Sequence, residues 1–217
     1  MDINKLIDDI SAADVDVKKF TSLVIEDVQA REEVVRLVLN HPHIMVYYHC
    51  YYILDQATLE RPDLFYTYWD DFVPLLEHRN SYHRDISLTL LANLTRVDEQ
   101  SRFELIFDRY FAHLHDVKFM TAVNCVQNSQ KIMRFKPDLV SHIVPLLLDT
   151  DTLTVYPLRQ KELMKSFILP ILDENFDILS AAKGVLEFMS SCTTSTSPKT
   201  KTAASNLLKK RGLSPLT

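Results

Sequence analysis

The sequence predicts an all-α fold in which a helical hairpin is repeated about five times. Three observations support this prediction. Apolar residues recur with the period of an α-helix, for example at Ile86, Leu90 and Leu94. No stretch shows the sustained alternation of apolar and polar residues, bounded by turns, that is typical of strands. A short apolar motif returns at a nearly constant distance along the chain.

The repeated motif is five residues long and ends the first helix of each predicted hairpin. Its copies are VVRLV from Val34, FVPLL from Phe72, YFAHL from Tyr110, IVPLL from Ile143 and VLEFM from Val185. Their first residues are separated by 38, 38, 33 and 42 positions. The first, second and fifth residues of every copy are apolar or aromatic, which places them on one face of a helix. We expect this face to pack against another element.

The helix starts repeat as well. Residues 61–65 and 136–140 both read basic-Pro-Asp-Leu-apolar, and each runs on to a Val-Pro-Leu-Leu. Proline in the first helical turn costs no hydrogen bond, and an early Asp complements the positive end of the helix dipole. After each copy of the five-residue motif comes a polar turn and a second amphipathic helix, at about 44–58, 83–97, 117–134, 157–169 and 198–211.

These patterns divide the chain into a cap, an array and a tail. Residues 1–23 are predicted to form an N-terminal helical cap, residues 24–211 the array, and residues 212–217 the C-terminal tail. The predicted hairpins are 24–58, 62–97, 101–134, 137–169 and 174–211. Because one hairpin cannot bury both faces of its helices, neighbouring hairpins must stack to form the core.

The array resembles the HEAT and armadillo-like repeat superfamily. HEAT units carry an Asp or Asn in the turn and an Arg or Lys early in the second helix, and comparable residues occur here. They are Asn80 with Arg84, Asp116 with Lys118, Asp149 or Asp151 with Arg159, and Lys199 or Lys201 after a Ser/Thr-rich turn. The resemblance implies a right-handed α-solenoid, with the second helices on its concave side and the polar pairs forming a ladder between units. The first hairpin lacks the basic residue, so we expect the ladder to be broken there.

Composition excludes several classes of protein. With 2 glycines among 217 residues, the chain cannot contain the glycine-rich loops of dinucleotide-binding domains or P-loop NTPases. The net charge of −5 does not indicate a dedicated nucleic-acid binder. Three widely spaced cysteines fit neither a disulfide framework nor a zinc ribbon. The acidic N-terminus is unlike a secretory signal, and no apolar run reaches the ~18 residues of a membrane span. We therefore expect a cytoplasmic protein with no membrane partner.

The second helices supply the candidate binding residues. On the concave face we expect Tyr48, Tyr51, Tyr52, Arg84, Lys118 and Arg159 to contact a partner. Four rings within residues 47–52 cannot all be core, and exposed tyrosines are effective interface anchors. Packing of these rings between the cap and the second hairpin is the alternative, and the sequence does not decide between the two.

The C-terminal helix is the second candidate. Residues 188–217 carry a net charge of +5, which leaves −10 for residues 1–187. The cations are Lys199, Lys201, Lys209, Lys210 and Arg211. This basic tail either docks an acidic partner, a phosphate backbone or another copy of the chain, or closes the array as a solvated cap.

Histidines gather in the predicted turns of the first three hairpins. They are His41, His43, His49, His78, His83, His113 and His115. Such a set could hold a metal, so a metal-dependent enzyme is one alternative. The HEAT-like hydroxylases that hold two irons use His-Glu dipeptides, however, and this sequence contains none. We also find no glycine-rich loop and no nucleophile with its base, and we predict neither a catalytic residue, a bound metal nor a cofactor.

The predicted function is that of a non-enzymatic scaffold or adaptor that binds a protein or peptide along its concave face. Nucleic-acid binding, connected with repair, is the main alternative, since the basic residues of the second helices could meet phosphates. Trp69-Asp70-Asp71 is similar to the Trp and Asp that surround an extruded base in HEAT-like DNA glycosylases, but no second Trp is present. The sequence predicts no particular oligomeric state.

Overall fold

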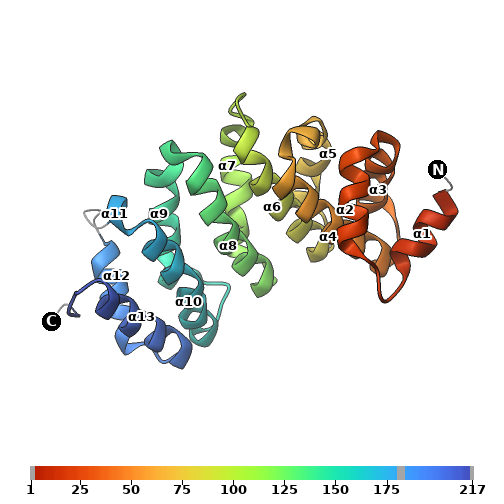
Figure 1. Ribbon diagram of the computed structural model, residues 1–217. Helices are drawn as coiled ribbons and strands as arrows, with labels where there is room; N and C mark the ends of the chain where they lie inside the picture. The colour runs from red at the N-terminus through yellow and green to blue at the C-terminus, as the bar shows by residue number, and fades with distance from the viewer. Residues whose placement is uncertain (1–2, 180–183, 216–217) are drawn as a thin grey trace. The chain divides into compact units, whose positions relative to one another are not determined.

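The computed structural model describes residues 3–179 and 184–215, and every regular element among them is a helix (Figure 1). The prediction of an all-α fold is thereby confirmed. The α-helices are α1 Ile3–Ser11, α2 Val17–Glu26, α3 Val28–Asn40, α4 Ile44–Glu60, α5 Trp69–Phe72, α6 Ser81–Leu94, α7 Arg102–Phe111, α8 Phe119–Phe135, α9 Val140–Leu148, α10 Leu158–Glu174, α11 Phe176–Leu179, α12 Val185–Ser191 and α13 Pro198–Lys210. Eight short 3-10 helices lie between them.

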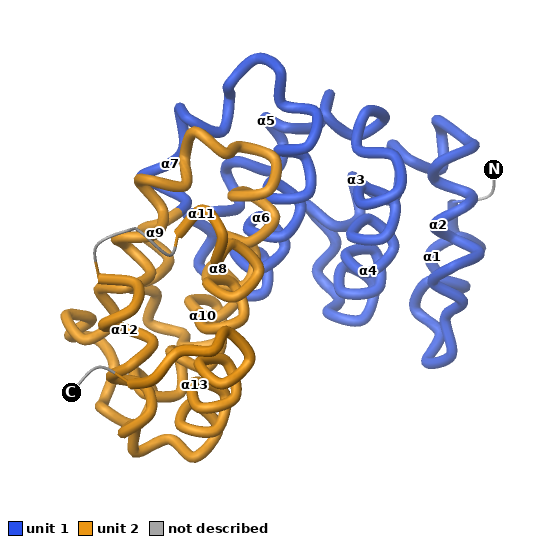
Figure 2. The backbone as a smooth tube through the Cα atoms, turned by 60° about the vertical axis from the view of Figure 1, so that its left-hand side comes forward, with its two compact units in different colours: residues 1–110 blue, residues 111–217 orange. Residues whose placement is uncertain are grey.

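The helices form two compact units, Met1–Tyr110 and Phe111–Thr217 (Figure 2). In unit 1, α2 and α3 both pack against α4, and α4 packs against α6 on its other side. In unit 2, α8 packs against α10, and α10 packs against α13. The long second helices of the predicted hairpins therefore lie next to one another within each unit.

Aspartates set the starts of α2 and α3 in unit 1. The Asp16 carboxylate accepts a hydrogen bond from the backbone N–H of Lys19 and caps α2. The Asp27 carboxylate does the same for Ala30 and caps α3. The boundary predicted between residues 23 and 24 thus falls inside α2, and the next helix begins after Asp27.

The first helix of the second hairpin is not continuous. Residues 62–77, where the sequence predicts one helix, consist of short 3-10 turns around the four-residue α5. Pro62 begins this segment, where its missing N–H costs no hydrogen bond, but Pro74 would lie in the interior of a continuous helix and lacks the N–H required there. Each proline lies in the first turn of a 3-10 helix. Phe65, Trp69 and Phe72 point inward from this segment and are completely or almost completely buried.

The apolar motif positions form the inner face of their helices. Thirteen of the fifteen first, second and fifth residues of the five copies are buried, for example Val34, Val35 and Val38. The other two, Val73 and Leu186, are half-buried.

Side-chain hydrogen bonds reveal the spacing of the packed neighbours. Within the two units, at least fourteen side-chain hydrogen bonds join positions 32 to 40 residues apart. This separation equals the length of one predicted hairpin, so side chains in each unit bond to the neighbouring hairpin. The right-handed solenoid itself stays a prediction.

Candidate functional site

The tyrosines of α4 divide between core and surface. The Tyr47 ring is buried against His83, with ring centroids 4.7 Å apart, and the Tyr47 hydroxyl accepts a hydrogen bond from the Asn80 amide. Tyr48 and Tyr51 are half-buried, and Tyr52 is 40% exposed. One of the four rings therefore belongs to the core, and the other three reach solvent to different degrees.

These three rings and Tyr82 of α6 form one cluster, which we call the tyrosine surface. Ring centroids lie 4.8 Å apart for Tyr48 and Tyr52, 5.3 Å for Tyr51 and Tyr52, and 5.7 Å for Tyr48 and Tyr82. Both close pairs that involve Tyr48 are edge-to-face, which is a favourable geometry for aromatic rings. The sequence analysis missed Tyr82, because its membership depends on α6 packing beside α4.

Hydrogen bonds fix the tyrosine surface to α6. The Tyr51 hydroxyl donates to Thr89 Oγ1 at 3.3 Å. One turn further along α4, Asp55 Oδ1 accepts a hydrogen bond of 2.8 Å from the Asn93 amide, which also donates to Thr58 Oγ1 at 2.9 Å. The Asp55 carboxylate therefore lies near the rings, and its hydrogen-bond partner is a neutral amide.

Two hydroxyls of the tyrosine surface are made less acidic by their surroundings. A hydrogen bond with Tyr52 raises the pKa of Tyr48 to about 12, helped by partial burial and by the charge of Asp85. Burial raises the pKa of Tyr51 to about 12, and the charges of Asp55 and Asp85 act in the same direction. At neutral pH Tyr48 and Tyr51 therefore present aromatic faces and neutral hydroxyls.

The three predicted basic contacts lie in different environments. Arg84 of α6 is buried, and its guanidinium donates to the backbone carbonyls of His78 and Arg79. Lys118, the residue before α8, is exposed. Arg159 of α10 is exposed and lines an open hollow of about 590 Å³ together with Lys199. Arg84 thus braces the turn before its own helix, whereas Lys118 and Arg159 face solvent.

The histidines that the sequence places in or near turns contact other groups of the chain, and one of them, His49, lies inside α4. The buried ring of His83 lies 4.2 Å from that of His78, and burial, with the nearby His78, lowers the pKa of His83 to about 4. His49 bonds to the carbonyl of Ile10, and the side chain of His113 contacts the Asp116 carboxylate. In the described part of the chain, no group of three or more His, Cys, Asp and Glu side chains has a geometry that could hold a metal ion.

Trp69 belongs to the core of unit 1. Its ring is 1% exposed, and the Arg102 guanidinium lies 5.5 Å from its centroid. Arg102 also forms an ion pair with Asp70. Trp69 is therefore packed beneath Arg102 of α7 and is not open to a base, while Asp70 is an exposed partner of the same arginine.

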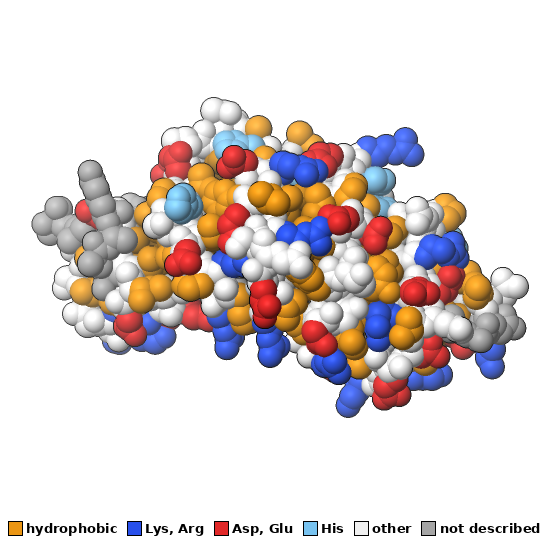
Figure 3. All heavy atoms as spheres, turned by 90° about the horizontal axis from the view of Figure 1, so that it is seen from above, with side chains coloured by type: hydrophobic (Ala, Val, Ile, Leu, Met, Phe, Trp, Pro, Cys, Tyr) orange, Lys and Arg blue, Asp and Glu red, His pale blue; other side chains and the backbone are white. Residues whose placement is uncertain are grey.

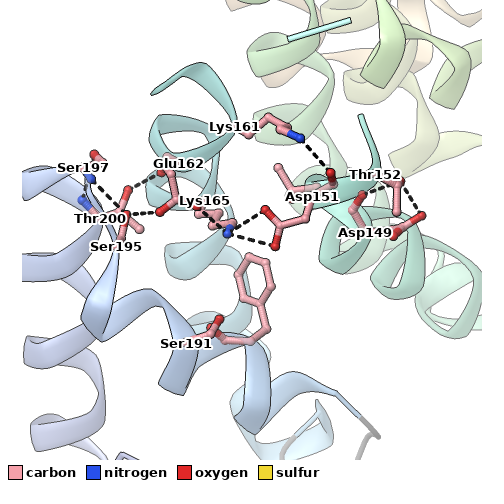
Figure 4. Close-up of polar contacts among 12 residues, drawn as sticks. Asp149, Asp151, Thr152, Lys161, Glu162, Lys165, Ser191, Ser195, Ser197 and Thr200 are labelled. Atoms are coloured by element: carbon pink, nitrogen blue, oxygen red, sulfur yellow. Dashed lines mark hydrogen bonds and ion pairs between the residues drawn. The ribbon is translucent and has the colours of Figure 1, made fainter. Parts of the chain in front are cut away.

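Unit 2 contains a polar network that was not predicted from the sequence, in which Lys165 and Glu162 are buried and Asp151 is exposed (Figure 4). Lys165 Nζ lies 2.7 Å from Glu162 Oε1 and 2.8 Å from Asp151 Oδ1. Ser195 donates to the same Glu162 carboxylate, and Thr200 donates to the Glu162 carbonyl. The predicted partner of Asp151 was Arg159, but its carboxylate pairs with Lys165 instead. The network joins α10 to the loop before α13.

Part of the basic tail is used inside unit 2. Arg211 Nε and Lys210 Nζ both donate to the Asp173 carboxylate of α10, at 2.8 and 2.6 Å. Lys199 Nζ lies 4.0 Å from the centroid of the Phe167 ring. The two remaining cations of the tail, Lys201 and Lys209, are exposed.

Comparison of the chain with family models, with curated proteins and with solved structures gave no match in any of the three. Among the described residues, no helix combines the length and the apolar character needed to cross a bilayer. The function is therefore inferred from the chain's own side chains.

Proposed function

We propose that the protein is a cytoplasmic, non-enzymatic interaction scaffold that binds a protein or peptide partner through the exposed starts of its long second helices. The observation that carries this proposal is a recurring exposed apolar side chain. Met45, Tyr82, Met120 and Leu158 are the first or second residues of α4, α6, α8 and α10, and each follows the previous one by 37 or 38 positions. Their exposed fractions are 37%, 43%, 63% and 59%.

Recurrence distinguishes these side chains from ordinary surface residues. Single exposed apolar residues are common on soluble proteins and need no explanation. Here, however, an apolar residue is kept at the same exposed point of four successive long helices. Unit 1 presents one such pair and unit 2 another, and in unit 1 the pair adjoins the tyrosine surface through Tyr82. Aromatic residues and Met are enriched at protein interfaces.

The environment of the cysteines also favours a non-enzymatic role. Cys50, Cys125 and Cys192 are all buried. Burial raises the pKa of each thiol, and that of Cys192 reaches about 12. Because the thiolate is the reactive form of cysteine, these side chains are suited to packing.

Charge favours a protein partner over nucleic acid in unit 1. Residues 1–110 contain 11 Lys and Arg and 20 Asp and Glu, a net charge of −9. On the face seen in Figure 3, acidic, basic and hydrophobic side chains are interspersed. Nucleic-acid binding depends on basic side chains that neutralise phosphates, and in unit 1 the predicted phosphate contact Arg84 is turned inward.

Affinity purification with mass spectrometry, using the full chain and two double variants, tests the proposal. Met45→Ser with Tyr82→Ser changes unit 1, and Met120→Ser with Leu158→Ser changes unit 2. We expect at least one double variant to lose a partner that the wild-type chain captures, because binding anchors would be removed.

Leu105 of α7 is the matched control, since it is 82% exposed but lies on a first helix. Leu105→Ser should capture the same partners as the wild-type chain. Partners retained by both double variants, or lost with Leu105→Ser, would contradict the proposal. Circular dichroism of each variant would verify that the helices are intact.

A further inference from the structure

The tyrosine surface indicates the chemical nature of its partner more specifically than the other exposed helix starts do. It combines four rings in mutual contact, two of them well exposed, with the carboxylates of Asp55 and Asp85 close enough to influence the tyrosine hydroxyls. Aromatic faces attract cations through their quadrupole, and a neighbouring carboxylate adds a direct ionic contact. This combination favours a cationic side chain.

The rest of unit 1 strengthens this preference. Its net charge of −9 attracts a basic segment over distances longer than a direct contact. An acidic peptide or a phosphate backbone would meet repulsion from the same charge. A basic segment of a protein is therefore the ligand that complements both the aromatic rings and the negative charge of unit 1.

The chain uses the same chemistry internally at other rings. Arg102 lies over Tyr66 and Trp69, Arg31 lies over Phe65, and Lys199 lies over Phe167. Among the described residues, no Lys or Arg of the chain itself lies over a ring of the tyrosine surface. Its exposed ring faces are thus open to a cation from another molecule.

We propose that the tyrosine surface binds an arginine-bearing segment of a protein partner, an inference that rests on the proposed scaffold function. Arginine fits better than lysine, because its planar guanidinium stacks on a ring and also donates to a carboxylate. Tyr52 and Tyr82 each contact Tyr48 edge-to-face, and Tyr52 is 40% and Tyr82 43% exposed, so a planar guanidinium can stack on the outer faces of these two rings.

Selection from a random 16-residue peptide library displayed on phage tests this inference with the full chain as bait. Tyr52→Leu is the informative variant, since it removes an exposed ring but keeps an apolar side chain of similar reach. Tyr52→Phe is its matched control, because the ring and its quadrupole remain. Asp55→Asn removes one carboxylate and keeps an oxygen that can accept from Asn93.

We expect the wild-type chain and Tyr52→Phe to enrich peptides that contain arginine. A fluorescein-labelled synthetic copy of an enriched peptide should bind Tyr52→Leu about 3- to 10-fold more weakly. It should bind Asp55→Asn about 2- to 5-fold more weakly. Replacing its arginine by glutamine should weaken binding to the wild-type chain and should have little further effect on Tyr52→Leu.

Two other outcomes would overturn the inference, and they can be told apart. Enriched peptides that lack basic residues, yet depend on Tyr52 and Tyr82, would refute the arginine preference and leave the scaffold function standing. If no peptide is enriched above the background of a Tyr52→Ser, Tyr82→Ser chain, both the preference and peptide binding at this surface are refuted.

Discussion

The tyrosine surface of unit 1 and the basic helix α13 of unit 2 are the two most unusual stretches of the sequence, but they differ in how their side chains are used. At the C-terminal end of α13, Lys210 and the next residue, Arg211, bind Asp173, about one hairpin earlier in the chain. On α4, the Tyr51 hydroxyl bonds to Thr89, one hairpin later, while the ring of Tyr52 stays exposed. An unusual composition shows where in the sequence a binding surface could lie. Contacts with the neighbouring hairpin then determine whether the side chains there are bonded within the chain or exposed to a partner.

Buried charged side chains contribute more to the stability of unit 2 than to the packing of the tyrosine surface. The Lys165 and Glu162 side chains are 7% and 10% exposed, and Lys165 is the cation that balances the buried charge of Glu162. We expect Lys165→Met to lower the free energy of unfolding by about 3–5 kcal/mol, because Glu162 would be left as a buried charge without its cation. Urea denaturation followed by circular dichroism measures this loss.

A second variant identifies the cause. Adding Glu162→Gln to Lys165→Met removes the stranded charge and should restore part of the lost stability. If Lys165→Met alone costs less than about 0.5 kcal/mol, the range of ordinary surface substitutions, the network does not hold unit 2 together.

Two of the predicted basic contacts, one near the start of α6 and one near the start of α10, provide a second comparison between the units. Arg84 is buried and donates to two backbone carbonyls, whereas Arg159 is exposed. We expect Arg84→Ala to lower the free energy of unfolding by about 1–3 kcal/mol, since a buried side chain would be removed and the carbonyls of His78 and Arg79 would lose their donor. Arg159→Ala should change it by no more than about 0.5 kcal/mol. Thermal melts of both variants test this difference. Equal losses of stability in the two variants would show that burial does not distinguish a structural role of Arg84 from a surface role of Arg159.

The sequence was sufficient to predict the helices and their inner faces. The motif residues Val34, Val35 and Val38 are buried as their spacing requires, because helical periodicity depends on local geometry. The broken helix at residues 62–77 was not predicted, although Pro62 and Pro74 were visible in the sequence. Proline is compatible with both a regular first turn and a 3-10 turn, so packing decides between them.

The sites were harder to predict than the helices. Lys165 looks like a residue of a solvated helix face, and only the approach of Asp151 and the loop before α13 makes it internal. Tyr82 joins the tyrosine surface through a helix that begins more than 30 residues after Tyr48. Both features depend on which hairpin lies beside which, and no local pattern contains that information.

Acid titration should weaken the carboxylate contacts of unit 2. Burial acts to raise the pKa of Glu162, but hydrogen bonds from Lys165 and Ser195, with the charge of Lys165, lower it below the usual value. A carboxyl with a lowered pKa stabilises the folded chain above the ordinary glutamate pKa of about 4.3, and this contribution is lost as the pH falls through the folded value. We expect unfolding by urea to become easier below about pH 4.3.

Glu162→Gln is the control for this titration. Its stability should fall less steeply over the same range of pH, because the group that titrates has been removed. Asp173, whose pKa is lowered by hydrogen bonds from Lys210 and Arg211 against the effect of burial, will still contribute a slope. Identical slopes for the wild-type chain and Glu162→Gln would remove Glu162 from the acid response.

The smallest effect on stability is expected at the tyrosine surface. Measuring this effect tests whether the exposed rings contribute to the packing of unit 1. Tyr52→Ser removes a ring that is 40% exposed and should change the free energy of unfolding by no more than about 0.5 kcal/mol. Tyr47→Ser, five residues earlier on the same helix, removes a buried ring and should cost about 3 kcal/mol. Thermal and urea denaturation of the two variants should therefore separate core from surface within residues 47–52. A loss at Tyr52 approaching that at Tyr47 would show that the exposed rings serve the packing of unit 1, and a partner would then have little reason to bind there.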